Sequence, residues 1–261
     1  MGGLKVAIAV EAKKLFRSKI PLLTMLALLL VPFMAGFFMF VLRNPDLARS
    51  LGFISAKAQI AGAADWPSYL ALLAQAVAVG GLIVFGFIIS WVFGREYADR
   101  TIKDLLALPI SRPMIVSAKF IVAAFWCFAL TGTIFIISVA VGSLLSLPGW
   151  SSAMLGVSVR NFSLVVLLTV LASIPVAFFA SAGKGYLPAL AFAVLSLVIA
   201  QIVTAVGYGE FFPWSVPALA SGLAGEDYVS ISRGNIFLVL FTALLGWLGT
   251  VLWWRFADCD C

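Results

Sequence analysis

Six long stretches without a charged side chain dominate this sequence. They cover residues 20–42, 69–93, 120–146, 162–182, 186–207 and 236–254, and none of them contains Asp, Glu, Lys or Arg. A helix needs about 20 apolar residues to cross the hydrocarbon core of a membrane. The composition agrees, since 11% of the residues are charged, whereas soluble chains carry about 25%. The sequence therefore predicts an all-α integral membrane protein with six transmembrane helices in a single domain, residues 1–261.

The segment before the first span, residues 1–19, mixes basic and apolar side chains. This pattern is typical of an interfacial helix on an anionic membrane surface, which makes membrane lipids an expected partner. The alternative is a signal peptide. However, the run over residues 20–42 is longer than the roughly 7–15 apolar residues of a signal peptide. We interpret it as a retained first span.

The distribution of lysine and arginine predicts the orientation. If the N-terminus is inside, the inner side holds twelve of the 17 basic residues and the outer side holds five: Arg43, Arg49, Lys57, Arg160 and Arg233. Basic residues favour the cytoplasmic side. We expect a multi-pass protein of the cell membrane, from a prokaryote, with both termini in the cytoplasm.

The most charged run, residues 93–119, lies between the second and third spans. Read as a helix over residues 96–108, it places opposite charges four residues apart and three apolar side chains on the other face. The expected pairs are Glu96–Arg100, Arg100–Asp104 and Asp99–Lys103, and the apolar residues are Ile102, Leu105 and Leu106. Pro109 would end this helix, and Ser111 with Pro113 would start the next. The alternative is an ordinary solvated loop with ion pairs.

This run resembles the intracellular loop of ABC-2 type transporter permeases. The resemblance is carried by Glu96, Thr101, the Leu-Leu-x-x-Pro-x-x-Arg motif over residues 105–112, and Lys119 at the start of the third span. Many members of that family have Gly where this chain has Arg100. The resemblance implies a coupling helix within residues 94–113 that docks on a separately encoded ABC ATPase. The residues it implies for coupling are Glu96, Asp99, Arg100, Thr101, Ile102, Asp104, Leu105 and Leu106.

The chain lacks the residues of a catalytic or nucleotide-binding subunit. It has no histidine, no span contains a base that would activate a nucleophile, and Gly183-Lys184-Gly185 does not complete a P-loop. We expect no catalytic site, metal or cofactor on this chain, with Mg-ATP bound by the partner. The basic residues form no patch for nucleic acid.

Uncharged polar residues in the spans are the candidates for a substrate path. We expect Gln75, Gln201 and Thr204 to line this path. The two glutamines are the stronger candidates, since a buried glutamine amide needs hydrogen-bond partners outside its own helix. The alternative for any Ser or Thr, including Thr131, Thr133, Thr169 and Ser173, is a bond to the backbone of its own helix. In the resembled family the second and fifth spans face the dimer axis, which implies a second permease subunit, in a homodimer or a heterodimer.

Two features of the last quarter of the sequence remain. Residues 208–234, between the fifth and sixth spans, are apolar but contain Pro213 and Pro217, which predicts a re-entrant segment of short helices rather than a seventh span. A plain amphipathic loop is the alternative. Cys259 and Cys261 close the chain, and we expect a mobile terminus there rather than a metal site.

Two functions fit these features. The first is the permease subunit of an ABC exporter, which moves an unidentified substrate out across the membrane with ATP hydrolysed on a separate subunit. The second is a membrane scaffold that does not transport and that anchors a soluble partner.

Overall fold

The structure is a computed structural model that describes residues 2–44, 63–102, 110–223 and 232–256. Six helical segments are long and apolar enough to span a membrane. They are α2 (Ile20–Arg43), α5 (Trp66–Ala98), α7 (Arg112–Leu144), α8 with α9 (Ser152–Ala182), α10 (Tyr186–Ala205) and α12 (Arg233–Phe256). Each overlaps one of the six predicted stretches, which confirms an all-α protein with six candidate membrane spans.

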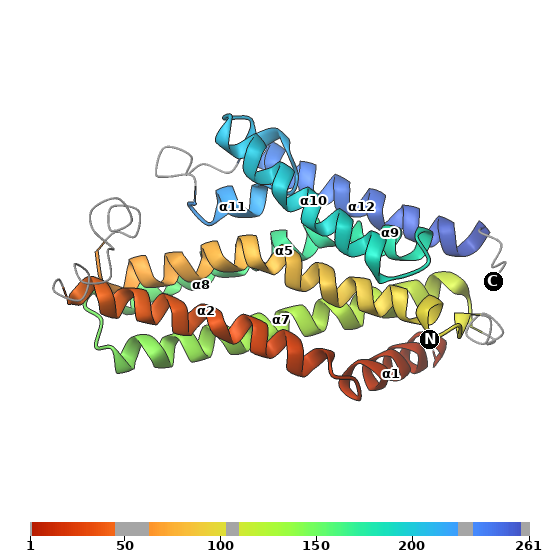
Figure 1. Cartoon of the computed structure of the whole chain (residues 1–261), viewed down its shortest axis with the longest axis horizontal. Coiled ribbons are helices and arrows are strands. Elements are labelled where there is room, and N and C mark those ends of the chain that lie inside the picture. The colour runs from red at the N-terminus through yellow and green to blue at the C-terminus, as the bar shows by residue number, and fades with distance from the viewer. Residues whose placement is uncertain (1, 45–62, 103–109, 224–231, 257–261) are drawn as a thin grey trace.

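The helices form an elongated bundle with α5 near its centre (Figure 1). Helix α5 contacts α2, α7, α8, α9 and α10, and Leu73, Val77, Phe85 and Ile88 along it are fully buried. Helix α1 and the C-terminal end of α12 lie at the same end of the bundle (Figure 1). This agrees with an even number of spans, and the side of the membrane that this end faces stays a prediction.

The helix of the fourth span is interrupted near its C-terminal end. Helix α8 (Ser152–Ser173) stops before Ile174 and Pro175, and the chain continues as the short helix α9 (Val176–Ala182). Proline has no backbone N–H to donate inside a helix, which explains the break. Gly246 of α12 packs against it, because a Cβ atom at Gly246 would lie 2.7 Å from Cα of Pro175.

Side-chain hydrogen bonds fasten neighbouring spans to one another. Trp126 of α7 donates from Nε1 to the hydroxyl of Thr24 of α2 over 3.1 Å, and the Tyr69 hydroxyl of α5 donates to the carbonyl of Pro32 over 3.3 Å. Such bonds are modest in membrane proteins, about 0.6 to 2 kcal/mol each. They fix which faces of α2, α5 and α7 meet.

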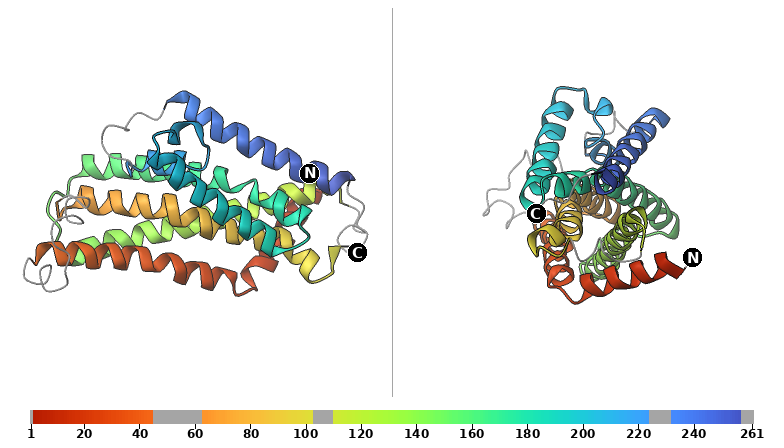
Figure 2. Two further views of the ribbon diagram at one scale, coloured as in Figure 1. Left: turned by 45° about the horizontal axis from the view of Figure 1, so that its top comes forward. Right: turned by 90° about the vertical axis from the view of Figure 1, so that its right-hand side faces the viewer.

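Helix α1 (Gly2–Phe16) precedes the first span and lies across the end of the bundle beside α7 (Figure 2). Ser18 closes the turn between α1 and α2, because its hydroxyl donates to the Leu15 carbonyl over 2.6 Å and accepts from the Ile20 N–H over 3.2 Å. A helix at this place was predicted, and its position on a membrane surface stays a prediction.

Short helices occur in the segment between the last two spans. They are the 3-10 helix η1 (Gly209–Phe211) and α11 (Val216–Ala220), and α11 packs against α8 and α5. Val216 is fully buried, and so is nearly all of Ser215. Short helices thus occur within residues 209–220 as predicted. The re-entrant path of this segment into the membrane stays a prediction, and residues 224–231 lie outside the described residues.

Candidate functional site: an ionic clasp beside the loop between spans two and three

The second span ends later than the sequence predicted, and its last turn contains Glu96. Helix α5 continues to Ala98, and the N–H of Thr101 donates to the Glu96 carbonyl over 2.9 Å while the N–H of Arg100 donates to the Tyr97 carbonyl over 3.3 Å. These two bonds, with a residue in the left-handed region between them, form the Schellman motif that ends many helices. Arg100 is that residue, with φ of 57°. Glycine adopts this conformation without steric cost, which explains why glycine suits this position in the resembled family.

The prediction that a separate coupling helix begins at Glu96 is therefore wrong. The expected Glu96–Arg100 pair is also wrong, because the reversal at Arg100 breaks the helical spacing that would align the two side chains. Glu96 instead points into the bundle and is 3% exposed. Asp99, expected to pair with Lys103, forms an ion pair with Arg95 over 3.0 Å.

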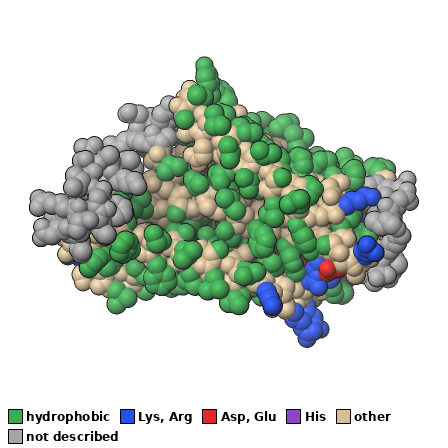
Figure 3. All heavy atoms as spheres, in the orientation of Figure 1, with side chains coloured by type: hydrophobic (Ala, Val, Ile, Leu, Met, Phe, Trp, Pro, Cys, Tyr) green, Lys and Arg blue, Asp and Glu red, His purple; other side chains and the backbone are tan. Residues whose placement is uncertain are grey.

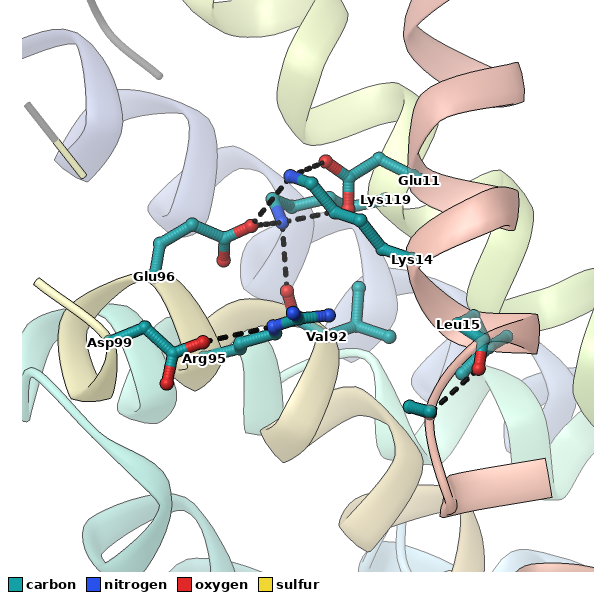
Figure 4. A network of polar contacts seen from close by, with 9 residues as sticks. Glu11, Lys14, Leu15, Val92, Arg95, Glu96, Asp99 and Lys119 are labelled. Carbon is teal, nitrogen blue, oxygen red and sulfur yellow. Dashed lines mark hydrogen bonds and ion pairs between the residues drawn. The ribbon is translucent and has the colours of Figure 1, made fainter. Parts of the chain in front are cut away.

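Four charged side chains from three helices meet inside the bundle at this point (Figure 4). We call them the ionic clasp: Glu11 and Lys14 of α1, Glu96 of α5 and Lys119 of α7. Lys119 is fully buried, and its Nζ lies 2.7 Å from Glu96 Oε1 and 3.0 Å from Glu11 Oε2. Lys14 Nζ lies 2.7 Å from Glu11 Oε1 and 3.2 Å from Glu96 Oε1. Two carboxylates therefore share two ammonium groups, and the clasp is electrically neutral.

The third donor position of Lys119 is also used. Its Nζ donates to the backbone carbonyl of Val92 over 2.8 Å, so all three ammonium protons have an acceptor. Burial of an ion is tolerated only when its charge is paired and its hydrogen bonds are made. Lys119 meets both conditions. Glu96 does not meet them fully, because Oε2 is buried and has no hydrogen-bond partner among the described residues.

Lys14 is the least buried member of the ionic clasp, with a side chain that is 29% exposed. Burial alone would lower the pKa of Lys14, but the charge and hydrogen bond of Glu11, followed by those of Glu96, outweigh burial and raise that pKa. A raised lysine pKa means that the folded protein holds the proton more tightly than the unfolded chain. The stabilisation from Lys14 is therefore complete below its unfolded pKa and is lost only when the pH rises through the folded value.

Arg112, the last residue of the Leu-Leu-x-x-Pro-x-x-Arg motif, connects two helices. It begins α7, and its Nη1 donates to the carbonyls of Trp254 over 3.0 Å and Arg255 over 3.2 Å. These carbonyls belong to the last turn of α12, where no N–H of the helix reaches them. A cation at this end also opposes the negative end of the helix dipole. Arg112 thus joins α12 to the start of α7. Ser111 precedes α7 as predicted but makes no side-chain capping bond.

The predicted coupling residues divide into three groups in the structure. Glu96 and Ile102 are buried within this chain, and Ile102 is 1% exposed, so the expectation that Ile102 offers its side chain to a partner is wrong for this conformation. Asp99, Arg100 and Thr101 are exposed. Asp104, Leu105 and Leu106 lie outside the described residues, and their role stays a prediction.

The predicted substrate-path residues have different surroundings in the structure. Gln75 is half-buried and Gln201 is exposed on α10, and the Thr204 hydroxyl donates to the Ala200 carbonyl of its own helix over 2.7 Å. The four other candidate hydroxyls also bond to carbonyls four residues earlier in their own helices: Thr131, Thr133, Thr169 and Ser173. The alternative weighed for the hydroxyl residues is therefore the correct one. A substrate path through Gln75 and Gln201 stays a prediction.

The comparisons with known proteins agree with the motif. The model of the family described as ABC-2 family transporter protein matches residues 7–201, which include the whole ionic clasp. This chain belongs to the ABC-2 transporter family. It is also similar to the bacitracin transport permease protein BCRB of Bacillus licheniformis, with 28% identity over 179 residues, covering 68% of this chain and 85% of that relative. As a family member it is a transmembrane permease of the kind that works with an ABC ATPase subunit.

Sequence reasoning identified Glu96 and Lys119 as motif residues but did not pair them, and it missed Glu11 and Lys14. Glu11 is the only acidic residue in the first 45 positions, which was a usable signal, since an isolated acid in a basic segment needs a reason. Its partner Lys119 is 108 positions away. Only the packing of α1 against α7 brings the two together.

Proposed function

We propose that this ABC-2 permease is the membrane subunit of an exporter, in which a separate ABC ATPase docks on the loop between α5 and α7. The observation that carries the proposal is the ionic clasp. Glu96 lies in the last turn of α5 before that loop, and Lys119 lies seven residues after α7 begins at Arg112. Glu11 and Lys14 bind α1 to both. A displacement of the loop would therefore move α1, α5 and α7 together rather than one helix alone.

The strength of the clasp supports this transmission. Breaking a buried ion pair by removing one partner costs about 3–5 kcal/mol, more than most single contacts between spans. Arg112 extends the connection to α12 through two carbonyl groups. ATP binding on the partner would close the ATPase pair, and the loop would pass this motion to the linked helices as a change from inward to outward access.

An amphiphilic peptide is the cargo class to test first. The similar permease from Bacillus licheniformis is named for bacitracin transport. In this chain, a groove of about 440 Å³ between α2 and α5 is lined by apolar side chains, among them Leu30, Met34 and Phe38. Such a groove suits the apolar part of a cargo better than a hydrophilic solute, because apolar contact is what it offers.

The test is co-purification of the permease with an ABC ATPase from its native host. Leu105→Ala with Leu106→Ala should remove roughly 2–4 kcal/mol of apolar contact at the proposed docking segment, so the permease should insert normally but lose its ATPase. Lys103→Ala, a charged residue of the same segment, is the matched control and should retain it. If the double variant keeps both its ATPase and its transport, the docking proposal is wrong. If no ATPase accompanies the unaltered permease, the scaffold alternative gains support.

A further inference from the structure

A cavity of about 500 Å³ lies beside the ionic clasp, between α1, the last turns of α5 and the start of α10. Four basic side chains line it: Lys13, Lys14, Arg17 and Arg95. Asp99 is the one acidic residue of the lining, and Trp91 and Tyr186 add aromatic surface. Basic side chains also gather at this end of the face shown in Figure 3, whereas the middle of that face is largely apolar.

Two of the four basic groups are neutralised within the chain. Lys14 pairs with Glu11 and Glu96, and Arg95 pairs with Asp99 over 3.0 Å while its guanidinium carbon lies 5.0 Å from the centre of the Trp91 ring. The side chains of Lys13 and Arg17 are exposed. Neither side chain forms an ion pair or a hydrogen bond with another described residue. The cavity therefore carries an excess of two positive charges, which attracts an anion.

The surroundings select the kind of anion. Helix α10 begins in the lining at Tyr186, and α2 begins two residues after Ser18 of the lining. The first turns of both helices expose large apolar side chains: Leu22 is 62% exposed, Leu23 is 52% and Leu187 is 80%. Tryptophan and tyrosine, like Trp91 and Tyr186, are enriched where the hydrocarbon core meets the headgroups. The basic cavity thus opens at headgroup depth beside surface that suits acyl chains. A soluble phosphate would gain nothing from this apolar surface.

We infer that this cavity binds the phosphate of an anionic phospholipid headgroup, with Lys13 and Arg17 as the residues that bind it. Basic pockets between transmembrane helices are a recurring way to hold such headgroups, and the volume lies within the range of about 300–1,000 Å³ of small-molecule sites. Because Lys14 and Arg95 belong to the same lining, a bound lipid connects α1 with the end of α5. The site would make the position of the clasp sensitive to lipid composition.

The test measures lipid binding by the full-length, detergent-purified protein. Native mass spectrometry compares phosphatidylglycerol with phosphatidylcholine of the same acyl chains. Lys13→Gln with Arg17→Gln should lower the preference for phosphatidylglycerol by about tenfold. Lys5→Gln with Lys19→Gln is the matched control, since it removes two exposed charges from the same end of the molecule without touching the cavity. Lys13→Arg with Arg17→Lys keeps the charges and should keep the preference.

Each outcome decides the inference. An unchanged preference in Lys13→Gln with Arg17→Gln, or an equal loss in the Lys5 and Lys19 control, would show that diffuse surface charge attracts the lipid, and would overturn the site. Displacement of the lipid by millimolar inorganic phosphate would assign the cavity to a soluble phosphate and overturn the lipid assignment. Loss of preference confined to the cavity variant, with no displacement by phosphate, supports it. All four changed residues are exposed, so the variants should fold.

Discussion

Replacing Lys119 by Met should destabilise this protein more than any other single change of charge. Methionine retains most of the length and apolar stem of lysine, so the change mainly removes the ammonium group. That group is fully buried and has three acceptors, Glu96, Glu11 and the Val92 carbonyl, at 2.7, 3.0 and 2.8 Å. Without it, two carboxylates share the single ammonium of Lys14, and one buried negative charge is uncompensated. The expected loss in the free energy of unfolding is about 3–5 kcal/mol.

The matched control is Arg95→Met in the last turn of α5. Its ion pair with Asp99 has side chains that are 34% and 51% exposed, and exposed pairs contribute about 0–1 kcal/mol. Reversible unfolding in mixed detergent micelles measures both variants under one condition. Adding Glu96→Gln to Lys119→Met leaves Glu11 and Lys14 as a balanced pair, so the double variant should be more stable than Lys119→Met alone.

The result that would refute this reasoning is specific. If Lys119→Met costs no more than Arg95→Met, the ammonium group is not a buried charge partner. If the double variant is less stable than Lys119→Met alone, charge balance does not govern the site.

Three further changes test other parts of the structure. Arg100→Gly should stabilise the end of α5 by about 1 kcal/mol, because Arg100 has a φ of 57° that glycine adopts freely; the thermal midpoint should rise, and a fall would contradict the Schellman turn. Gly246→Val should lower the free energy of unfolding by roughly 1–3 kcal/mol or more, because its Cβ would lie 2.7 Å from the backbone of Pro175. The control is Gly156→Val of α8, where a Cβ meets nothing within 4 Å; an equal loss there would contradict the packing role of Gly246. Arg112→Gln should weaken the contact between α7 and the end of α12 by about 1–3 kcal/mol, since charged hydrogen bonds to the Trp254 and Arg255 carbonyls are lost. The rate of amide hydrogen exchange in the last turn of α12 should rise, and an unchanged rate would contradict the capping role.

The spans were predictable from the sequence, because crossing a membrane demands about 20 apolar residues and this requirement is local. The ends of the helices were harder to predict than their existence. The predicted second span stopped at Phe93, but α5 continues through Arg95 and Glu96 to Ala98, since a helix does not end where its apolar stretch ends. The stop depends on the backbone reversal at Arg100, and an arginine gives no sequence signal for a turn at which glycine is the residue expected.

The candidate site was predictable in its parts and not in its assembly. The motif named Glu96, Thr101, Arg112 and Lys119, but charge spacing along one helix suggested the wrong partners for Glu96. Its true partners come from α1 and α7, 82 and 23 positions away. Pairings of this kind depend on tertiary packing, which periodicity within one helix does not encode. The same limit applies to Gln75 and Gln201, which were chosen for their chemistry alone.

The most direct test of the central proposal is the ratio of transport to ATP hydrolysis in proteoliposomes that contain the permease and its ATPase. The Glu96→Gln, Lys119→Met double variant removes the links of α5 and α7 through the clasp and leaves the loop residues unchanged. If the clasp transmits the motion of the loop, this variant should retain its ATPase and hydrolyse ATP, but transport per ATP should fall sharply. A folded double variant that transports as much cargo per ATP as the unaltered permease would contradict the account.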